Sequence, residues 1–253
     1  MAKGYSKQVS DRAKASRALV QSLETNSTAI VEALESTLSR GAAKPKKLGD
    51  LGALFAAMGE LVGAASEALE AADQAHELEM ADDVAPRDAR DVAAGLVREV
   101  MVDLRSALVA AYAPAALRAT GLAGSAPQDP QVLLTYGKTV LEGLAQADLG
   151  APKRAGLRVD VKAFSKDLGA NLAELEASLS TVAREVREGE ATLSAKTKAL
   201  TENDRVYQRA ASAIEALARL GGREDIADKV RPSTRRPGLA EEGTVEPQPT
   251  PQT

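Results

Sequence analysis

The residues closest to a known chemical pattern are an aspartate and the single histidine of the chain. Asp73 and His76 are three positions apart, so on a helix their side chains project from the same face. Carboxylate-bundle metal centres take such a pair from each of two helices, and this chain has only 1 histidine. Two interpretations stay open: a solvated or capping histidine, or a weak divalent-cation or small-ligand site supported by the acidic neighbours Glu77, Glu79, Asp82 and Asp83.

A second pattern, Gly137-Lys138-Thr139, resembles the end of a phosphate-binding loop. The motif requires a glycine at the position of Val132, and it follows a strand, whereas this tripeptide lies in an apolar helical pattern. We interpret the resemblance as coincidence.

Other catalytic patterns are missing from the sequence. There is no nucleophile elbow and no dinucleotide-binding glycine fingerprint, and a cysteine count of 0 excludes thiolate chemistry. Glu185 and Glu188 are spaced as on an exposed helix face, whereas catalysis by paired carboxylates needs a desolvated cleft. The sequence therefore predicts no enzymatic activity, no catalytic residues, no metal ligand set and no cofactor.

The composition favours helices as the elements that position these residues. Aromatic residues make up 2% and hydrophobic residues 44% of the 253 residues, so the core is aliphatic. Strong helix formers, alanine and leucine above all, dominate, and β-branched residues do not cluster into strand-like runs. We expect an all-α protein, an antiparallel up-and-down bundle of about five main helices joined by short connections.

The charge and hydropathy patterns limit the partners. A net charge of −4 and a pI of about 5.3 give no general attraction to phosphate backbones, so nucleic-acid binding is not expected. No stretch reaches the roughly 18 apolar residues that a membrane span needs. The first ten residues are polar, which does not resemble a signal peptide, and we expect a cytoplasmic protein.

Aspartate at several helix starts and glycine at helix ends mark the expected boundaries. On this basis helices are predicted at about 6–40, 50–83, 86–112, 130–148 and 160–220. We assign the chain to a bundle at 1–158, a long helix at 159–221, a short helix at 222–230 and a proline-rich disordered tail at 231–253.

The long helix carries an uninterrupted heptad. Its core positions recur at alternating steps of four and three from Leu168 to Leu217, and a break would not preserve this phase. We therefore expect one continuous or gently bent helix of about 90 Å, at about 1.5 Å per residue. Gly189 and a capping-box pattern at Thr201 and Asp204 are the contrary signs.

The C-terminal half of this heptad is the predicted interaction surface. The first two helices match only about half of the long helix in length, and a large apolar side chain left in water forgoes about 1.5 to 3 kcal/mol. Either the long helix folds back, or a second copy or another protein covers it. The candidate surface is Leu193, Lys196, Leu200, Asn203, Val206, Tyr207, Ala210, Ile214 and Leu217.

Two polar residues interrupt this surface at the same heptad position. Lys196 and Asn203 would fix the register of a helix pair if they were buried. In the alternative interpretation, this section faces solvent or is broken. Gly189 also has two interpretations: it marks either a close approach of two helices or a local bend.

The second predicted helix is rich in glycine. Gly52, Gly59 and Gly63 lie near its apolar face, and small residues at four-residue spacing favour close contact between helices. We attribute these glycines to tight packing within the bundle, since Asp50 and Glu60 count against membrane insertion.

Basic residues form three clusters. The cluster at the start of the tail is the better candidate for binding an anionic partner, because a flexible segment can adapt to one. Solubility is an alternative explanation for all three clusters. The clusters are Lys44, Lys46 and Lys47; Lys153, Arg154 and Arg158; and Arg231, Arg235 and Arg236.

These observations favour a non-enzymatic structural or adaptor protein that acts through coiled-coil-like partner binding or self-association. One alternative is a bundle that binds a small ligand or a metal ion near His76. Another is a membrane-active protein that opens its bundle to expose the glycine-rich helix.

Overall fold

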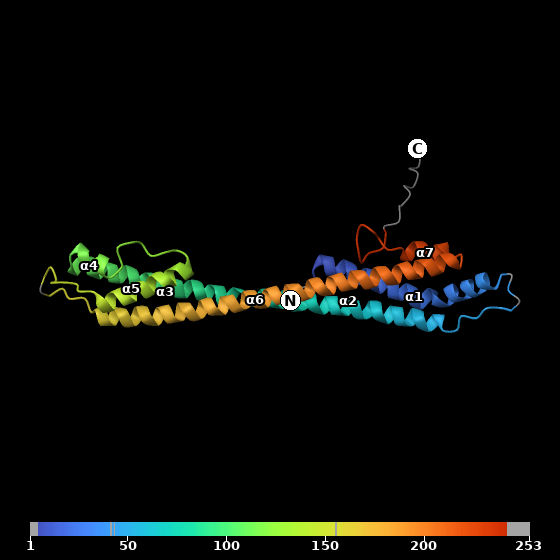
Figure 1. The fold of residues 1–253 in the computed structure, drawn as a ribbon, viewed down its shortest axis with the longest axis horizontal. Helices are drawn as coiled ribbons and strands as arrows, with labels where there is room; N and C mark the ends of the chain where they lie inside the picture. The colour runs from blue at the N-terminus through green and yellow to red at the C-terminus, as the bar shows by residue number, and fades with distance from the viewer. Residues whose placement is uncertain (1–4, 41, 43, 155, 242–253) are drawn as a thin grey trace, which may run out of the picture. The chain divides into compact units, whose positions relative to one another are not determined.

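The computed structural model describes residues 5–40, 42, 44–154 and 156–241, and within them it is an all-α protein without strands. This confirms the predicted fold class, including the long C-terminal helix (Figure 1). The helices are α1 (Lys7–Ser39), α2 (Leu51–Asp82), α3 (Val84–Ala111), α4 (Pro114–Ala119), α5 (Pro130–Gln146), α6 (Val161–Leu220) and α7 (Glu224–Val230).

Local capping explains where two of these helices begin. The Asp129 carboxylate accepts hydrogen bonds from the backbone N–H groups of Gln131 and Val132, both at 2.9 Å, and Pro130 occupies the first turn of α5. Asp160 accepts a bond of 3.0 Å from the Ala163 N–H at the start of α6. Both aspartates satisfy donors that a helix start leaves without partners.

Helix α6 is a single helix of 60 residues, as the unbroken heptad predicts. The Thr201 hydroxyl donates to the Thr197 carbonyl oxygen at 2.9 Å, one turn earlier in the same helix. Thr201 is therefore not the cap of a new helix. No atom lies within 4 Å of a Cβ built on Gly189, so this glycine does not mark a close helix approach.

The helices are divided between two compact units. Unit 1 consists of the described residues within 1–77 and 191–253, and unit 2 consists of the described residues within 78–190. The sequence led us to expect one bundle at 1–158 packed on the first half of the long helix. Instead, α1 and the first part of α2 share a core with the second half of α6, whereas α3 and α5 share one with its first half.

The core of unit 2 also differs in detail from the periodicity expected for α3. The sequence spacing predicts Val92, Leu96, Val100, Leu104 and Leu108 as its apolar stripe, but Val92 and Leu96 are 64% and 43% exposed. The buried face instead runs through Ala93, Val97 and Met101. The alanine residues of α3 make both of these faces apolar, so the sequence alone does not distinguish the two assignments.

The chain after α7 turns back on itself. Pro232 pairs with Ala240 across an isolated bridge, and the Ser233 N–H donates to the Leu239 carbonyl oxygen at 2.7 Å. Gly238 allows the turn with a φ of +76°. Part of the predicted disordered tail, 231–241, thus has defined structure, and the remaining residues, 242–253, lie outside the described residues.

No helix in the described part of the chain is both long enough and apolar enough to span a membrane.

Candidate functional site

The predicted interaction surface on α6 is mostly part of the core of unit 1. Val206, Tyr207, Ala210 and Ile214 are between 1% and 6% exposed. Leu217 is half-buried, whereas Leu193 is 49% exposed. The residues that share this core come from α1 and α2: Leu19, Leu23, Ile30, Leu34, Phe55 and Val62.

This burial corrects the expectation that the C-terminal half of the heptad needs a partner. We expected the first two helices to pack along the first half of α6. Because α1 and α2 instead pack on the second half, the chain itself removes the apolar stripe from water. The reason for placing an interface there is gone, and a binding surface must be sought elsewhere.

Lys196 is paired within the unit. Its Nζ lies 2.6 Å from Asp73 Oδ1 of α2, and the Asp73 side chain is 0% exposed. The Ser6 N–H and hydroxyl also donate to this carboxylate, at 2.8 and 3.0 Å. Burial alone would raise the pKa of Asp73, but the hydrogen bonds from Lys196 and Ser6 lower it below its ordinary value.

Asn203 and its neighbour Asp204 face α1 in the same unit. The Ser16 hydroxyl lies 3.4 Å from Asn203 Oδ1, and Asn203 Nδ2 is buried without a hydrogen-bond partner. Arg12 donates two hydrogen bonds to Asp204, at 2.7 and 3.0 Å. These polar contacts, with the Lys196 pair, align α6 with α1 and α2, so any register they fix is intramolecular.

The histidine pattern does not converge on one site. His76 Nδ1 lies 3.0 Å from the Thr192 hydroxyl of α6. Both oxygens of Asp73, the other half of the pattern, already accept hydrogen bonds from Lys196 or Ser6. The two side chains therefore take part in separate contacts between α2 and α6.

Three glutamates of unit 2 come together instead. Carboxylate oxygens of Glu79, Glu185 and Glu188 all lie within 4.8 Å of one another, and Glu79 Oε1 is buried without a hydrogen-bond partner. Burial, followed by repulsion from the other two carboxylates, raises the pKa of Glu79. Arg184 lies 2.9 Å from Glu185 and offsets part of this negative charge.

This cluster corrects the interpretation of Glu185 as part of an exposed helix face, because its side chain is only 13% exposed. Sequence reasoning missed the cluster because Glu79 and Glu185 lie on different helices, far apart in the chain. No sequence spacing connects them.

The Gly137-Lys138-Thr139 pattern serves helix packing. A Cβ on Gly137 would lie 2.5 Å from Leu172 Cδ2, so glycine allows α5 to approach α6 closely. Lys138 pairs with Glu176 at 2.8 Å, and the Thr139 hydroxyl donates within its own helix, at 3.2 Å, to the Thr135 carbonyl oxygen.

Residues of the three basic clusters also make contacts within their own units. Lys47 pairs with Glu35 at 3.0 Å, and the Lys153 ammonium donates to the Val109 carbonyl oxygen at 2.6 Å. Arg231 pairs with Glu241 at 3.3 Å.

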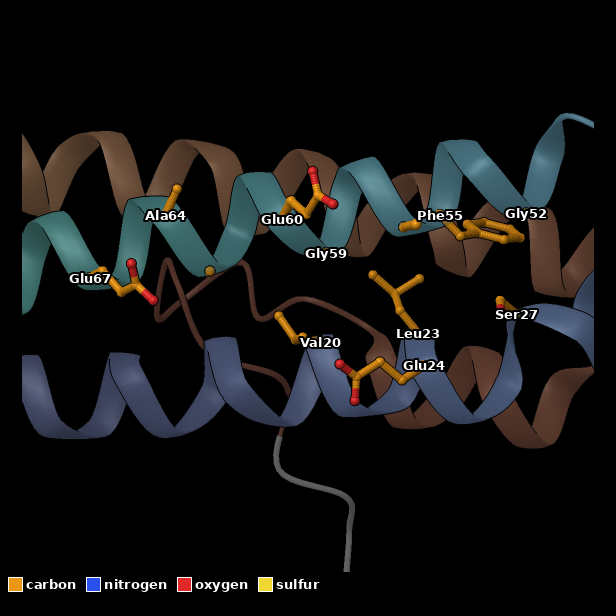
Figure 2. A pocket seen from close by; sticks show the side chains of 12 residues that line it. Val20, Leu23, Glu24, Ser27, Gly52, Phe55, Gly59, Glu60, Ala64 and Glu67 are labelled. Carbon is orange, nitrogen blue, oxygen red and sulfur yellow. The ribbon is translucent and has the colours of Figure 1, made fainter.

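An elongated depression runs between α1 and α2 in unit 1, and we call it the α1/α2 groove. One section has a volume of about 550 Å³, and an adjoining section has about 540 Å³. In Figure 2, Val20 and Leu23 extend from α1 toward α2. The two sections adjoin each other, since both are lined by Val20, Glu24, Gly63 and Glu67.

Small residues of α2 form much of the groove surface, and the chain does not fill the space above them. A Cβ on Gly59 would meet Leu23 Cδ1 at 3.8 Å, an ordinary contact, whereas nothing lies within 4 Å of a Cβ on Gly52 or Gly63. Only Gly59 therefore contacts the neighbouring helix, and at a distance that an added Cβ would also allow. The attribution of all three to bundle packing is wrong.

The groove is rimmed by negative charge. Its lining contains Glu24 of α1 and Glu60, Glu67 and Glu70 of α2, against one basic residue, Arg17. Arg17 lies 3.9 Å from Glu70 and is 66% exposed, so this ion pair is long and solvated. Among the described residues, Glu24, Glu60 and Glu67 form no salt bridge.

Comparison of the chain with protein-family models, curated proteins and solved structures finds no match. The groove therefore has to be interpreted from its own shape and charge.

Proposed function

We propose that this protein is a non-enzymatic adaptor that binds a partner protein in the α1/α2 groove. The observation that carries the proposal is the groove itself, whose two adjoining sections share lining residues and include Gly63, next to which the chain leaves open space. This surface replaces the C-terminal heptad of α6, which is occupied by the chain's own helices.

The energetics of glycine in helices support the proposal. A glycine inside a helix destabilises it by about 0.5 to 1 kcal/mol relative to alanine. Gly63 lies well inside α2, and no neighbouring atom of the chain would meet an added methyl group. No contact within the chain requires a glycine at this position, and because Gly63 lines the groove, a partner helix there would gain a closer approach.

The lining of the groove favours binding over catalysis. Lys196 and the buried Asp73 of unit 1 are engaged with each other in a contact between helices. The groove has acidic side chains on an open surface rather than a nucleophile and a base within hydrogen-bonding distance. Binding is therefore the function that this surface supports best.

Site-specific photo-crosslinking in the cells that make the protein tests the proposal. A benzoylphenylalanine at Gly63 places the reactive ketone in the groove, and the same residue at Gly95 of α3 is the matched control. Gly95 is also helical and has no atom within 4 Å of its Cβ position, but it lies outside the groove lining. We expect a defined adduct with another protein from Gly63 and not from Gly95. No adduct, or the same adducts from both positions, would reject the proposal.

A further inference from the structure

We infer that the occupant of the α1/α2 groove is an amphipathic helix of another protein, with an apolar stripe flanked on both sides by lysine or arginine. This inference rests on the proposed function and adds the chemistry of the partner. It follows from the groove's length, its lining and the sign of its charge.

The groove has the dimensions of a helix-binding surface. From Gly52 to Glu70, both in the lining, α2 rises about 27 Å at about 1.5 Å per residue, which matches a helix of about 18 residues. Small side chains let two helix axes approach to about 8 Å, the lower end of normal packing. A partner helix would therefore seat its apolar stripe over Gly63.

The apolar part of the lining lies where such a stripe would contact it. Val20 and Leu23 of α1 and Phe55 of α2 line the deeper part of the groove, and Leu23 and Phe55 are nearly completely buried. Because these two side chains are already covered by the chain, the apolar surface open to a partner helix is that of Val20, Ala56 and Ala64. This is the helix-in-groove mode, in which anchors recur at three- and four-residue spacing.

The charge on the rim determines which flanks the partner needs. Glu24 lies on the α1 side, and Glu60 and Glu67 lie on the α2 side, so carboxylates face a bound helix from both edges. Each exposed pair with a lysine or arginine contributes only about 0.2 to 1 kcal/mol. Together, however, such pairs accelerate association and exclude acidic partners.

Other occupants fit this charge poorly. Nucleic acids and anionic lipid surfaces carry negative charge and would be repelled by the rim. A divalent cation needs converging oxygens, and the described groups that meet this geometry are Glu79, Glu185 and Glu188, which are not in the groove. A second copy of the chain would bring a net charge of −4 to an already acidic surface.

Fluorescence anisotropy with the full chain tests this inference. The probe is a labelled 18-residue peptide (a length set from about 1.5 Å per residue) with leucine and alanine at positions i, i+3, i+4 and i+7 and lysine on both flanks. A second peptide with glutamate in place of every lysine is its control. We expect saturable binding of the lysine peptide that weakens as salt is added, and no binding of the glutamate peptide.

Charge reversal in the protein locates the binding site. We expect Glu60→Lys combined with Glu67→Lys to weaken binding at least about tenfold. Glu142→Lys with Glu174→Lys, which makes the same change in net charge on exposed residues of unit 2, should leave it nearly unchanged. Equal weakening by both pairs, or no binding to the wild-type chain, would overturn the inference.

Failure of the inference and failure of the proposed function give different results. If Gly63 forms a specific adduct in cells but the lysine peptide does not bind, the protein has a partner of another chemistry and only the inference fails. If the adduct is absent as well, both fail.

Discussion

The Lys196 ammonium of α6 lies 2.6 Å from a carboxylate oxygen of Asp73 on α2, and the Asp73 side chain has no exposed surface. Ser6, just before α1, donates two further hydrogen bonds to the same carboxylate. One buried anion thus connects three parts of unit 1. Lys196 occupies a core position of the heptad, and its charge is compensated there by Asp73 of the same chain.

Asp73→Asn should destabilise the protein by roughly 2 kcal/mol at neutral pH, because it leaves the partly buried Lys196 without its counter-charge. The pKa of Asp73 is lowered in the folded state, so its stabilisation is present at neutral pH and is lost as the pH falls through that lowered pKa. Urea unfolding of both proteins from neutral to acidic pH measures this. The difference between them should shrink on acidification.

Replacing both partners is the matched control for this pair. Asp73→Leu with Lys196→Met removes both charges and leaves apolar groups in their place, which should recover much of the stability lost in Asp73→Asn. A double variant that is less stable than Asp73→Asn would contradict this view of the pair.

Asn203→Leu should raise the free energy of unfolding by about 1 kcal/mol. The reason is that Asn203 Nδ2 is buried without a hydrogen-bond partner, and an apolar side chain of similar size removes this desolvation cost. Combining it with Ser16→Ala removes the other half of the 3.4 Å contact. Thermal unfolding measures the Tm of both variants. A Tm of the combined variant below that of the wild-type protein would show that this polar contact stabilises the fold.

Glycine-to-alanine substitutions should change stability in opposite directions according to the space around each glycine. Gly63→Ala and Gly95→Ala, which meet nothing within 4 Å, should each stabilise by about 0.5 to 1 kcal/mol. Gly143→Ala should destabilise by roughly 1 to 3 kcal/mol, because its Cβ would lie 2.8 Å from the Thr120 carbonyl oxygen. Destabilisation by Gly63→Ala would mean that the groove is closed in solution.

Tyr207 gives a prediction at high pH. Burial raises its pKa to about 12, so the folded state resists ionisation that the unfolded chain undergoes at about pH 10. The stability of the fold should therefore fall as the pH rises between these values. Tyrosinate absorbance measures the titration. In Tyr207→Phe, this part of the pH dependence should disappear, and an unchanged alkaline loss of stability would assign it to another group.

Features that depend on neighbouring residues along the chain could be predicted from the sequence. Aspartate marks helix starts, and Asp129 and Asp160 indeed cap α5 and α6. The unbroken heptad correctly indicates a single α6. Each of these signals is local, since capping acts over three residues and the heptad phase accumulates along one helix.

Features that depend on which helices meet could not be predicted in this way. The amphipathic faces of α1, α2 and α3 look alike in sequence, so nothing indicates that α1 and α2 would cover the second half of α6. The helix lengths alone suggested that α1 and α2 would pack on the first half of α6. The α1/α2 groove was missed for the same reason, because an uncovered glycine such as Gly63 and a tightly packed one have the same sequence signature.

Hydrogen–deuterium exchange of the full chain, with and without the lysine-flanked peptide, tests the central claim most directly. The claim is that the seam of α6 is core and that the α1/α2 groove is the binding surface. We expect amides at 203–217 to exchange slowly in the free protein and not to change on peptide addition. Amides at 16–27 and 52–70 should slow when the peptide binds. Rapid exchange at 203–217 in the free protein, with protection appearing there on peptide binding or at higher protein concentration, would contradict the account.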